Sequence, residues 1–466
     1  MKFHRSVIAL VVVLASAALA FGAEGNWTVA RYDEGQTGFT PQKIELPLTV
    51  CWEFNTAKFD DNPSVPAVVD GVVYFASGNR VYAVDAETGA MKWRYPSTER
   101  LNFNIKTGIT VWENLVFFGG TDGNVYALDA EQNGRIVWRY PTSGPVRSTP
   151  VVSDQTLFVG SDDNSLYAID ARSGVLSWDG GFRTRDDISA APAISPGVVV
   201  FQSMDANIYA ANTASGRIRW SFQLPVSPVR SAPIFAGNNI FLNAGNTIYG
   251  LNSKNGQIRY ALQLPSDVCA PLAIAENTIV AVCRNKKMYA YEVTPAGVRS
   301  KWEAPAEIGA SVIAAPTIAG DLIFVGCTKG MINAYSLETG QLMWSYIIAP
   351  ALAGESNMQK ADFTDIAAPV VVSNGSLFVL TDDGTLHCFR NSAADNTPPS
   401  IIAPMPAIGS AMSGQPPIPV SAIIYDDSTG VDPKSIELWL DDQQVPHEFD
   451  PTTLKLTYET PITQPL

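Results

Sequence analysis

Reactive side chains are scarce in this chain. Only three of its 466 residues are histidine, five are cysteine, and charged residues make up 16% of the total. A catalytic thiol needs a histidine base nearby, and a zinc site needs several Cys or His ligands. No segment has the spacing of a calcium-binding loop either. We therefore expect no metal site, and no catalytic residue of the thiol type.

Basic residues are also few relative to acidic ones. The chain has 31 Lys and Arg residues against 45 Asp and Glu residues, which gives a net charge of −14. Such a chain is repelled by nucleic-acid phosphates and anionic lipid headgroups, so a nucleic-acid partner is excluded. The 46% hydrophobic residues, 35 glycines and 32 prolines are typical of a globular protein with many turns. We expect an all-β fold.

Long apolar runs are absent beyond the N-terminus. Residues 1–20 begin with basic residues, continue as an apolar run, and end at the small residues Ala18 and Ala20. This pattern predicts a cleaved signal peptide. The alternative is a membrane anchor, but the run is shorter than the roughly 20 residues that span a bilayer. The first cysteine is Cys51, so no lipid-attachment cysteine follows the run. We expect a periplasmic or secreted protein with no integral membrane segment after cleavage.

The sequence does contain a repeat with a period of about 40 residues, which is typical of solenoids and propellers. Clear copies read VYAVDAETGAMKW, VYALDAEQNGRIVW and LYAIDARSGVLSW. Eight aligned positions mark the copies: Tyr82, Tyr126, Tyr167, Tyr209, Tyr249, Tyr289, Asn333 and His387.

Each copy has the pattern of a β-hairpin. Alternating apolar residues lead to an Asp or Asn, a Gly follows four positions later, and a second run ends in Trp, as at Asp85, Gly89 and Trp93. Another strand pair precedes each hairpin, so each unit supplies the four antiparallel strands of one propeller blade. The sequence predicts an eight-bladed β-propeller over residues 21–392, or seven blades if the degenerate last copy does not close.

The last copy lacks its Trp-bearing strand. The segment LTVCWEF at residues 48–54 has no partner of its own before the first unit. We predict that this N-terminal strand, with Trp52, completes the eighth blade and closes the ring, which removes two exposed sheet edges.

The composition changes after the repeats. Residues 393–400 predict a polar linker, and residues 401–466 resemble a bacterial immunoglobulin-like module. Residues 396–466 carry two lysines against nine acidic residues, which we interpret as a solvated acidic face. Because an Ig-like sandwich takes roughly 100 residues, we expect the module to be incomplete: either the chain is a fragment or the final strands come from elsewhere.

The hairpin pattern AxDxxTGxxxW is complete from Ala83 to Trp93. It resembles the tryptophan-docking motif of quinoprotein alcohol dehydrogenases and their non-catalytic relatives, the family of pyrroloquinoline-quinone (PQQ)-like β-propeller repeats. The resemblance implies that each tryptophan is a structural wedge between neighbouring blades. The tryptophans concerned are Trp52, Trp93, Trp138, Trp178, Trp220, Trp302 and Trp344.

For the quinone-dependent members, the resemblance implies two adjacent cysteines, a calcium held by Glu, Asn and Asp, and an Asp base. This sequence has no adjacent cysteines and no CxxCH haem motif. We therefore expect the non-catalytic branch: a protein that is not an enzyme, has no cofactor, and binds or scaffolds a protein partner or a small anionic ligand. A dehydrogenase that uses PQQ with calcium is the alternative.

Two cysteine pairs are candidates for disulfides in an oxidising compartment. Alignment with the intact motif places Cys51 opposite Cys388 across the closing strands. Cys269 and Cys283 each lie seven residues from Glu276, which suggests a cross-strand pair.

Basic residues precede several of the predicted innermost strands. Arg147, Arg185, Arg230 and Lys106 could meet at one mouth of the central channel and hold a carboxylate or phosphate. The alternative is that they are solvated, or paired with Asp186, Asp187 and Asp365. The insertion at residues 350–364 is either a loop that contacts a protein partner or an ordinary surface loop.

Overall fold

The structure is a computed structural model. It describes residues 25–56, 64–225, 231–348, 364–391, 400–405, 419–425, 431, 433–440, 443–450 and 454–459. The predicted signal peptide, Arg230, most of the insertion at 350–364 and all but the last residue of the predicted linker lie outside the described residues.

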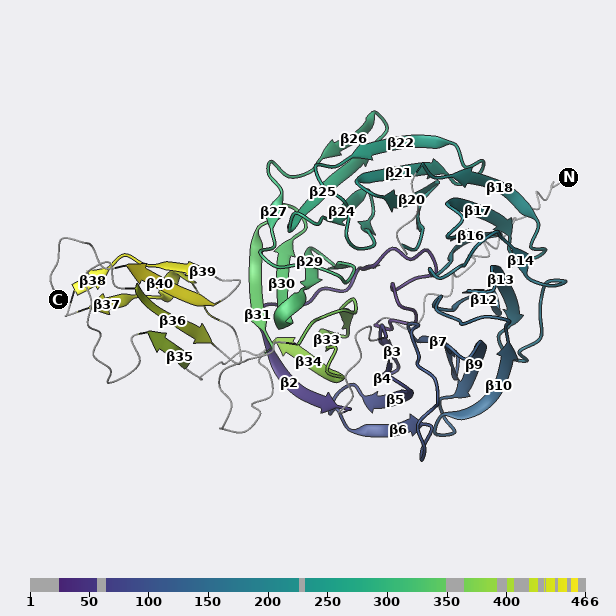
Figure 1. The fold of residues 1–466 in the computed structure, drawn as a ribbon, viewed down its shortest axis with the longest axis horizontal. Coiled ribbons are helices and arrows are strands. Elements are labelled where there is room, and N and C mark those ends of the chain that lie inside the picture. Colours follow the sequence, from purple (N-terminus) through teal and green to yellow (C-terminus); the bar gives the residue numbers. More distant parts are fainter. Residues whose placement is uncertain are drawn as a thin grey trace, which may run out of the picture.

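Most of the described chain forms β-sheets arranged in a ring around a common centre (Figure 1). We number the sheets in chain order, and the strand given first for each sheet lies nearest the centre, except that β1 pairs with the inner edge of sheet 7. The first four sheets contain β3 (Ala67–Val69), β4 (Val72–Ser77), β5 (Arg80–Asp85) and β6 (Met91–Tyr95); β7 (Thr110–Trp112), β8 (Leu115–Gly119), β9 (Asn124–Asp129) and β10 (Arg135–Pro141); β11 (Val151–Ser153), β12 (Thr156–Ser161), β13 (Ser165–Asp170) and β14 (Phe182–Arg183); β15 (Ala193–Ser195), β16 (Val198–Gln202), β17 (Asn207–Asn212) and β18 (Ile218–Gln223).

Four further sheets complete the ring. They contain β19 (Ile234–Ala236), β20 (Asn239–Ala244), β21 (Thr247–Asn252) and β22 (Ile258–Gln263); β23 (Ala273–Ala275), β24 (Thr278–Val282), β25 (Lys287–Thr294), β26 (Gly297–Ser300) and β27 (Ala306–Glu307); β28 (Thr317–Ala319), β29 (Leu322–Gly326), β30 (Met331–Ser336), β31 (Leu342–Ile347) and the parallel strand β1 (Phe39–Thr40); β32 (Val371–Ser373), β33 (Ser376–Leu380), β34 (Thr385–Asn391) and β2 (Leu48–Asn55). The helical elements among the described residues are two short 3-10 turns, η1 (Thr328–Gly330) and η2 (Pro433–Ser435). No helix in this described part is long and apolar enough to cross a membrane.

The hairpins form where the repeat places Asp and Gly. In sheet 1, the Asp85 carboxylate accepts hydrogen bonds from the Thr88 N–H at 3.0 Å and the Thr88 hydroxyl at 2.9 Å. Gly89 then adopts a φ of 71°, a left-handed conformation that glycine tolerates best. The same arrangement recurs in sheet 3, where Ser173 donates to Asp170. Local side-chain hydrogen bonds therefore set the turns between the third and fourth strands.

Tryptophans join most of the sheets to the next one. The Trp93 indole of sheet 1 lies against Gly134 of sheet 2, where a Cβ atom would overlap the ring, and its Nε1–H donates to the Ala130 carbonyl at 2.9 Å. The same donation to a carbonyl of the following sheet is made by Trp52 to Ala86, Trp138 to Ala171, Trp178 to Thr213, Trp220 to Ser253 and Trp302 to Leu337. Trp344 instead packs edge to face on Phe389, with ring centroids 6.2 Å apart.

The N-terminal strand β2 completes the eighth sheet. It pairs antiparallel with β34, so that Trp52 lies opposite Cys388 and Glu53 opposite His387. Trp52 also lies against Gly89 of sheet 1. The strand predicted from the unpaired LTVCWEF segment therefore joins the last sheet to the first.

The tail forms a smaller β unit to the left of the ring in Figure 1. Its sheet has the order β35 (Ser400–Met405), β36 (Pro419–Tyr425), β40 (Lys455–Glu459) and β39 (Glu448–Asp450), and a separate hairpin joins β37 (Leu438–Leu440) to β38 (Gln443–Val445). Leu454 packs against the apolar cluster between sheets 6 and 7. The incomplete Ig-like sandwich stays a prediction.

Candidate functional site

The centre of the ring is crossed by an N-terminal segment, Gly25 to Gln42, which we call the central segment. Its backbone carbonyls accept hydrogen bonds from the innermost strands of several sheets (Figure 1, purple). The donors are Val111, Ile194, Phe235, Ile274 and Ile318, each with an N···O distance of 2.8 to 2.9 Å. The central segment thus supplies acceptors for backbone N–H groups of the innermost strands, which would otherwise face the central channel.

A tight loop in the central segment places Arg31. Asp33 accepts hydrogen bonds from the Thr37 N–H at 2.9 Å and the Thr37 hydroxyl at 2.7 Å. The Gly38 N–H closes the loop by donating to the Arg31 carbonyl at 2.9 Å. Gly38 has a φ of 67°, and a Cβ at this position would overlap the Arg31 guanidinium. A residue larger than glycine would therefore displace that side chain.

Arg31 is a buried cation with unmatched donors. Only 6% of the residue is exposed, and its Nη2 donates to the Leu272 carbonyl. Its Nε and Nη1 have no acceptor in the described part of the chain. Burial lowers the pKa of Arg31 to about 10, while the Asp33 charge opposes that shift. The guanidinium stays protonated at neutral pH, and each unmatched buried donor costs about 1–3 kcal/mol.

The acidic neighbours do not neutralise Arg31 by a direct ion pair. Asp33 uses its carboxylate oxygens for Thr37, and burial raises the pKa of this carboxyl group against the effect of those hydrogen bonds. Burial likewise raises the pKa of Glu34. Gln36 is fully buried beside them, and its Oε1 has no donor within the described residues. The free Nε–H and Nη1 donors lie on different edges of the guanidinium, and each could donate a charge-assisted hydrogen bond to an oxygen of a small anion.

The basic residues predicted at the channel mouth have individual partners where the structure describes them, and their convergence on one ligand stays a prediction. Arg147 pairs with the buried carboxylate of Asp162, which agrees with the paired alternative, although with another aspartate. Arg185 donates its backbone N–H to Asp205 at 3.2 Å. Lys106 already has a partner, and Arg230 lies outside the described residues. The buried cation with unmatched donors is Arg31 instead.

The first predicted disulfide fails because of a β-bulge. In β2 the register shifts between Val50 and Trp52, so Trp52 lies opposite Cys388 and Cys51 is the extra residue of the bulge. Cys51 is exposed and Cys388 is buried, and both are free thiols. The bulge is a general feature of the repeat, since Ala83 likewise pairs with Trp93 rather than with Lys92.

The second predicted pair is also unbridged. Ala275 pairs with Thr278, so the turn is centred between Glu276 and Asn277 rather than on Glu276. Val268 lies opposite Cys283, and Cys269 bonds to Val282. Adjacent residues of a strand point to opposite faces, so the two thiols diverge: Cys283 packs between sheets 5 and 6, and Cys269 packs between sheets 6 and 7.

The described residues do not together form a site that fits a bound quinone. They contain no group of three or more His, Cys, Asp or Glu side chains that could hold a metal ion. The central segment also occupies the middle of the ring. Arg31 is a suitable partner for a carboxylate, but no metal-binding group accompanies it within the described residues, so we derive no quinone chemistry from this arrangement.

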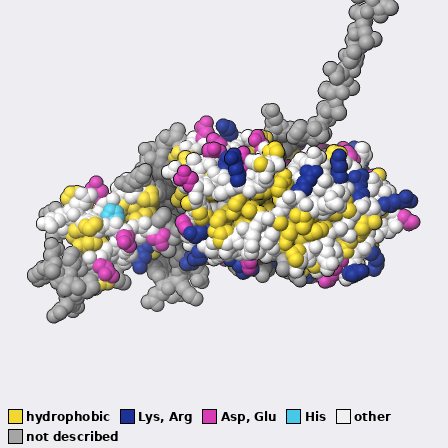
Figure 2. All heavy atoms as spheres, turned by 90° about the horizontal axis from the view of Figure 1, so that it is seen from above, with side chains coloured by type: hydrophobic (Ala, Val, Ile, Leu, Met, Phe, Trp, Pro, Cys, Tyr) yellow, Lys and Arg dark blue, Asp and Glu magenta, His cyan; other side chains and the backbone are white. Residues whose placement is uncertain are grey.

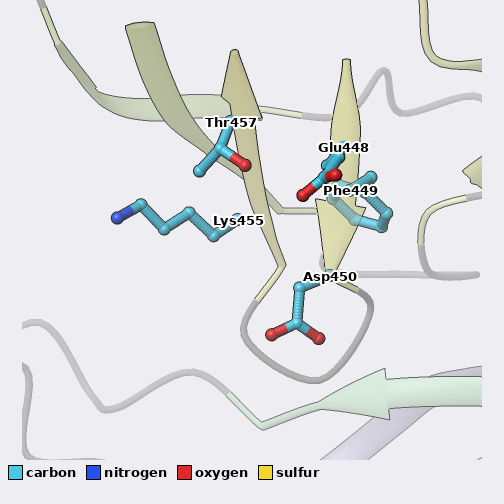
Figure 3. A pocket seen from close by; sticks show the side chains of 5 residues that line it. All are labelled: Glu448, Phe449, Asp450, Lys455 and Thr457. Carbon is cyan, nitrogen blue, oxygen red and sulfur yellow. The ribbon is translucent and has the colours of Figure 1, made fainter. Parts of the chain in front are cut away.

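Two cavities lie away from the centre. One, of about 320 Å³, lies between sheets 6 and 7 and is lined by residues that include Asn333, Tyr335 and Ser345. Their polar groups bond to one another: Ser345 donates to Asn333, and Asn333 donates to Tyr335. The other lies on the tail, where Figure 3 shows five side chains spread along β39 and β40 rather than converging on one point: Glu448, Phe449, Asp450, Lys455 and Thr457. Neither cavity presents a buried donor without an acceptor, as Arg31 does.

Comparison with known proteins reveals both enzymes and assembly proteins. A segment of 152 residues is 30% identical to a 1-butanol dehydrogenase (cytochrome c) of Thauera butanivorans, covering 30% of this chain and 22% of that protein. A segment of 168 residues is 27% identical to the outer membrane protein assembly factor BamB of Burkholderia pseudomallei, covering 36% of this chain and 42% of that protein. The chain thus spans less than half the length of these curated relatives.

The fold has solved counterparts. The quinohemoprotein alcohol dehydrogenase of Comamonas testosteroni superposes with a TM-score of 0.61 at 14% identity, covering 81% of this chain and 83% of that one. At this identity the likeness shows the fold alone.

The relatives correct one prediction. The missing cysteine pair and haem motif lead us to expect a protein that is not an enzyme. The curated relatives include the 1-butanol dehydrogenase and several quinoprotein alcohol dehydrogenases, so this prediction is wrong.

The family itself is clear from the repeats. Residues 49–132, 77–186 and 179–411 match the model of a family described as outer membrane protein assembly factor BamB. Together these segments include every hairpin copy from sheet 1 to sheet 8. The chain therefore belongs to this family of PQQ-like propeller repeats.

Proposed function

We propose that this chain is an exported, eight-bladed β-propeller that acts as a binding protein, and that the ligand at the centre of its ring is a small anion. One observation carries the proposal: the buried guanidinium of Arg31 keeps two N–H donors without an acceptor. A carboxylate is a common biological anion whose oxygens accept strong, charge-assisted hydrogen bonds from an arginine.

The proposal includes the organisation expected from the sequence. Residues 1–20 act as a signal peptide for export to the periplasm or beyond, residues 21–392 form the eight blades, residues 393–400 are a linker, and residues 401–466 form an incomplete Ig-like module. The eight successive sheets and the pairing of β2 with β34 support a closed ring.

A protein partner is part of the same proposal. The relative from Burkholderia pseudomallei is named as an outer membrane protein assembly factor, and scaffolding suits a rigid ring. The exposed apolar side chains on the outer strands support it as well: they include Met91, Ile136, Ile218, Ile258 and Leu342. Such side chains, repeated around a rim, are available to a partner surface.

A quinone-dependent alcohol dehydrogenase is the second candidate. The similarity to a 1-butanol dehydrogenase favours it, and the Arg31 guanidinium could bind a carboxylate of the quinone. The two candidates therefore compete for the same side chain and are distinguished by the ligand.

The experiment is a titration of the purified chain with acetate, succinate and citrate, followed by calorimetry and by thermal unfolding at constant ionic strength. We expect at least one carboxylate to bind and raise the Tm of the wild-type protein. The Arg31→Met variant loses this response, Arg31→Lys retains part of it, and Arg147→Met serves as the matched control that keeps it.

Two outcomes contradict the anion proposal. The first is that no carboxylate binds the wild-type protein. The second is an equal response in wild type and Arg31→Met, which would indicate a general salt effect. A parallel titration with PQQ and calcium, monitored by absorbance, tests the second candidate: uptake of one equivalent that depends on Arg31 would replace the small-anion proposal by the dehydrogenase.

A further inference from the structure

One sector of this acidic chain contains only basic charges. Residues 206–266, which cover β17 to β22, contain no Asp or Glu and five basic residues: Arg217, Arg219, Arg230, Lys254 and Arg259. The net charge of the whole chain is −14, so this sector has the opposite sign to its surroundings.

The outer strands of this sector also expose apolar side chains. Ile218 on β18 is 54% exposed and Ile258 on β22 is 48% exposed. Figure 2 shows the wall of the ring over these strands, with hydrophobic and basic side chains interleaved along it. We call the surface formed by Arg217, Ile218, Arg219, Ile258 and Arg259 the cationic wall.

The positive charge of the wall is not cancelled by neighbouring carboxylates. Arg219 donates to the Gly197 carbonyl at 2.7 Å, and Arg259 donates to the Asn239 side-chain oxygen at 3.0 Å. Neither arginine forms an ion pair in the described part of the chain. Because these acceptors are neutral, both guanidinium charges remain available to an anionic partner.

The cationic wall also includes two sheet edges that are not covered by another strand of the same sheet. β18 and β22 are the last strands of sheets 4 and 5, so each has one edge that no strand of its own sheet covers. Such an edge pairs readily with another strand. A lipid surface or a free anion cannot supply those backbone hydrogen bonds, so the edges favour a protein partner that contains β-structure.

The tail has the complementary features. Residues 396–466 carry two lysines against nine acidic residues. In the hairpin of β37 and β38, Trp439 is 56% exposed, and its Nε1–H donates to the Glu437 carboxylate at 3.0 Å. This two-stranded hairpin also has free edges. It therefore combines an indole, a carboxylate and open strands on one acidic surface.

The same combination of groups already occurs within the ring. The guanidinium of Arg172 lies 5.3 Å from the centre of the Trp112 ring and pairs with the Glu113 carboxylate at 2.6 Å. A tryptophan and an acidic neighbour thus hold one arginine by a cation–π contact and an ion pair together. Trp439 and Glu437 offer the same pair of groups to an arginine of the wall.

We propose that the β37–β38 hairpin of one copy docks on the cationic wall of a second copy, with Trp439 and Glu437 receiving Arg219 or Arg259. The partner is a second copy because the hairpin lies at the end of the tail farthest from its own ring, whereas β18 lies on the far side of that ring (Figure 1). The contact joins two different surfaces, so it adds copies head to tail.

The experiment is sedimentation velocity of the full chain at increasing concentration, in low and in high salt. The average mass of the wild type rises with concentration in low salt and falls towards the monomer in high salt, since charge pairs are screened. The wall variant Arg219→Glu/Arg259→Glu and the tail variant Glu437→Lys/Trp439→Ala each weaken self-association at least tenfold. Arg135→Glu/Arg139→Glu on β10 is the matched control and associates like the wild type.

Mixing the two variants gives the sharpest test. The wall variant keeps a working tail and the tail variant keeps a working wall, so an equimolar mixture forms a one-to-one dimer that neither variant forms alone. The proposal is overturned if the wild type stays monomeric in low salt, if the mixture stays monomeric, or if the β10 control loses association to the same extent. Binding of a wild-type monomer to phosphatidylglycerol vesicles would assign the wall to anionic lipid and also overturn it.

Discussion

Two neighbouring interfaces of the ring are built differently. Between sheets 4 and 5, the Trp220 indole lies on Gly256 and donates to the Ser253 carbonyl at 3.0 Å. Between sheets 5 and 6, the aligned position is Tyr260, which packs back onto its own sheet against Phe241 and over Gly250. Most other sheets have alanine where sheet 5 has Gly250, so the missing methyl group makes room for the tyrosine ring.

The difference shows that docking depends on a pair of residues. The turn of sheet 6 has Gly297 where the other hairpins have their receiving glycine, and a Cβ there would meet no atom within 4 Å. Both the indole and its receiving surface are thus missing at the same interface. Apolar side chains of sheets 5 and 6 fill the space instead, among them Ile248, Val268 and Ile279.

The largest effect is expected from removing the two aromatic residues. Trp220→Ala removes a buried indole from the space between two sheets and should lower the free energy of unfolding by about 3–5 kcal/mol. Tyr260→Ala should cost about half as much, because Tyr260 is only half-buried and contacts its own sheet. Chemical denaturation of both variants measures the difference, and equal losses would contradict the distinction between the interfaces.

A smaller effect is expected at the receiving glycine. Gly256 and Gly237 of sheet 5 both have positive φ, of 70° and 58°, but only Gly256 faces an indole. Gly237→Ala should cost about 1 kcal/mol of backbone strain, and Gly256→Ala about 2–3 kcal/mol, since the methyl group also overlaps Trp220. If thermal unfolding gives the same loss of stability for both variants, then Gly256 is required only for its backbone conformation and not for its contact with Trp220.

The smallest effect is expected at the closing interface. The Glu53 carboxylate accepts a hydrogen bond from His387 Nδ1 at 2.9 Å, which lowers the pKa of Glu53 from its ordinary value of 4.5. A lowered pKa stabilises the folded state above the unfolded pKa, and this contribution is lost as the pH falls through the folded value. Glu53 is largely exposed, so we expect less than about 1 kcal/mol.

The measurement is urea unfolding of the wild type and Glu53→Gln between pH 3 and 7. The wild type should be more stable at pH 7, and the two curves should converge at the acid end. A difference that is constant over this range would show that the carboxylate charge does not contribute to closure.

The repeat made much of the ring predictable from the sequence. The Asp-to-Gly spacing encodes hairpins through local hydrogen bonds, as at Asp85 and Thr88. The last copy lacks its Trp-bearing strand, and the unpaired N-terminal segment supplies it as β2. The β-bulge was not predictable from the period, because it adds one residue without changing the spacing of the copies. The pairing of Cys51 with Cys388 failed for this reason.

The role of Arg31 could not be predicted from the repeats. It lies before the first copy, in a segment whose hydrogen-bond partners reach from Val68 to Ser373. Such contacts depend on closure of the whole ring and leave no periodic pattern in the sequence. The available signal was local: Asp33, Thr37 and Gly38 have the spacing of a tight loop, which implies that the loop holds a side chain in place.

The pairing of β2 with β34 has a consequence for how the chain folds as it is synthesised. Among the strands of the eight sheets that pair antiparallel, β2 is made first and its partner β34 is made last, more than 300 residues later. The growing chain therefore carries an unpaired strand until the eighth sheet is complete, and the ring can close only after that. Any factor that shields residues 48–55 during that interval would speed maturation without touching the finished protein.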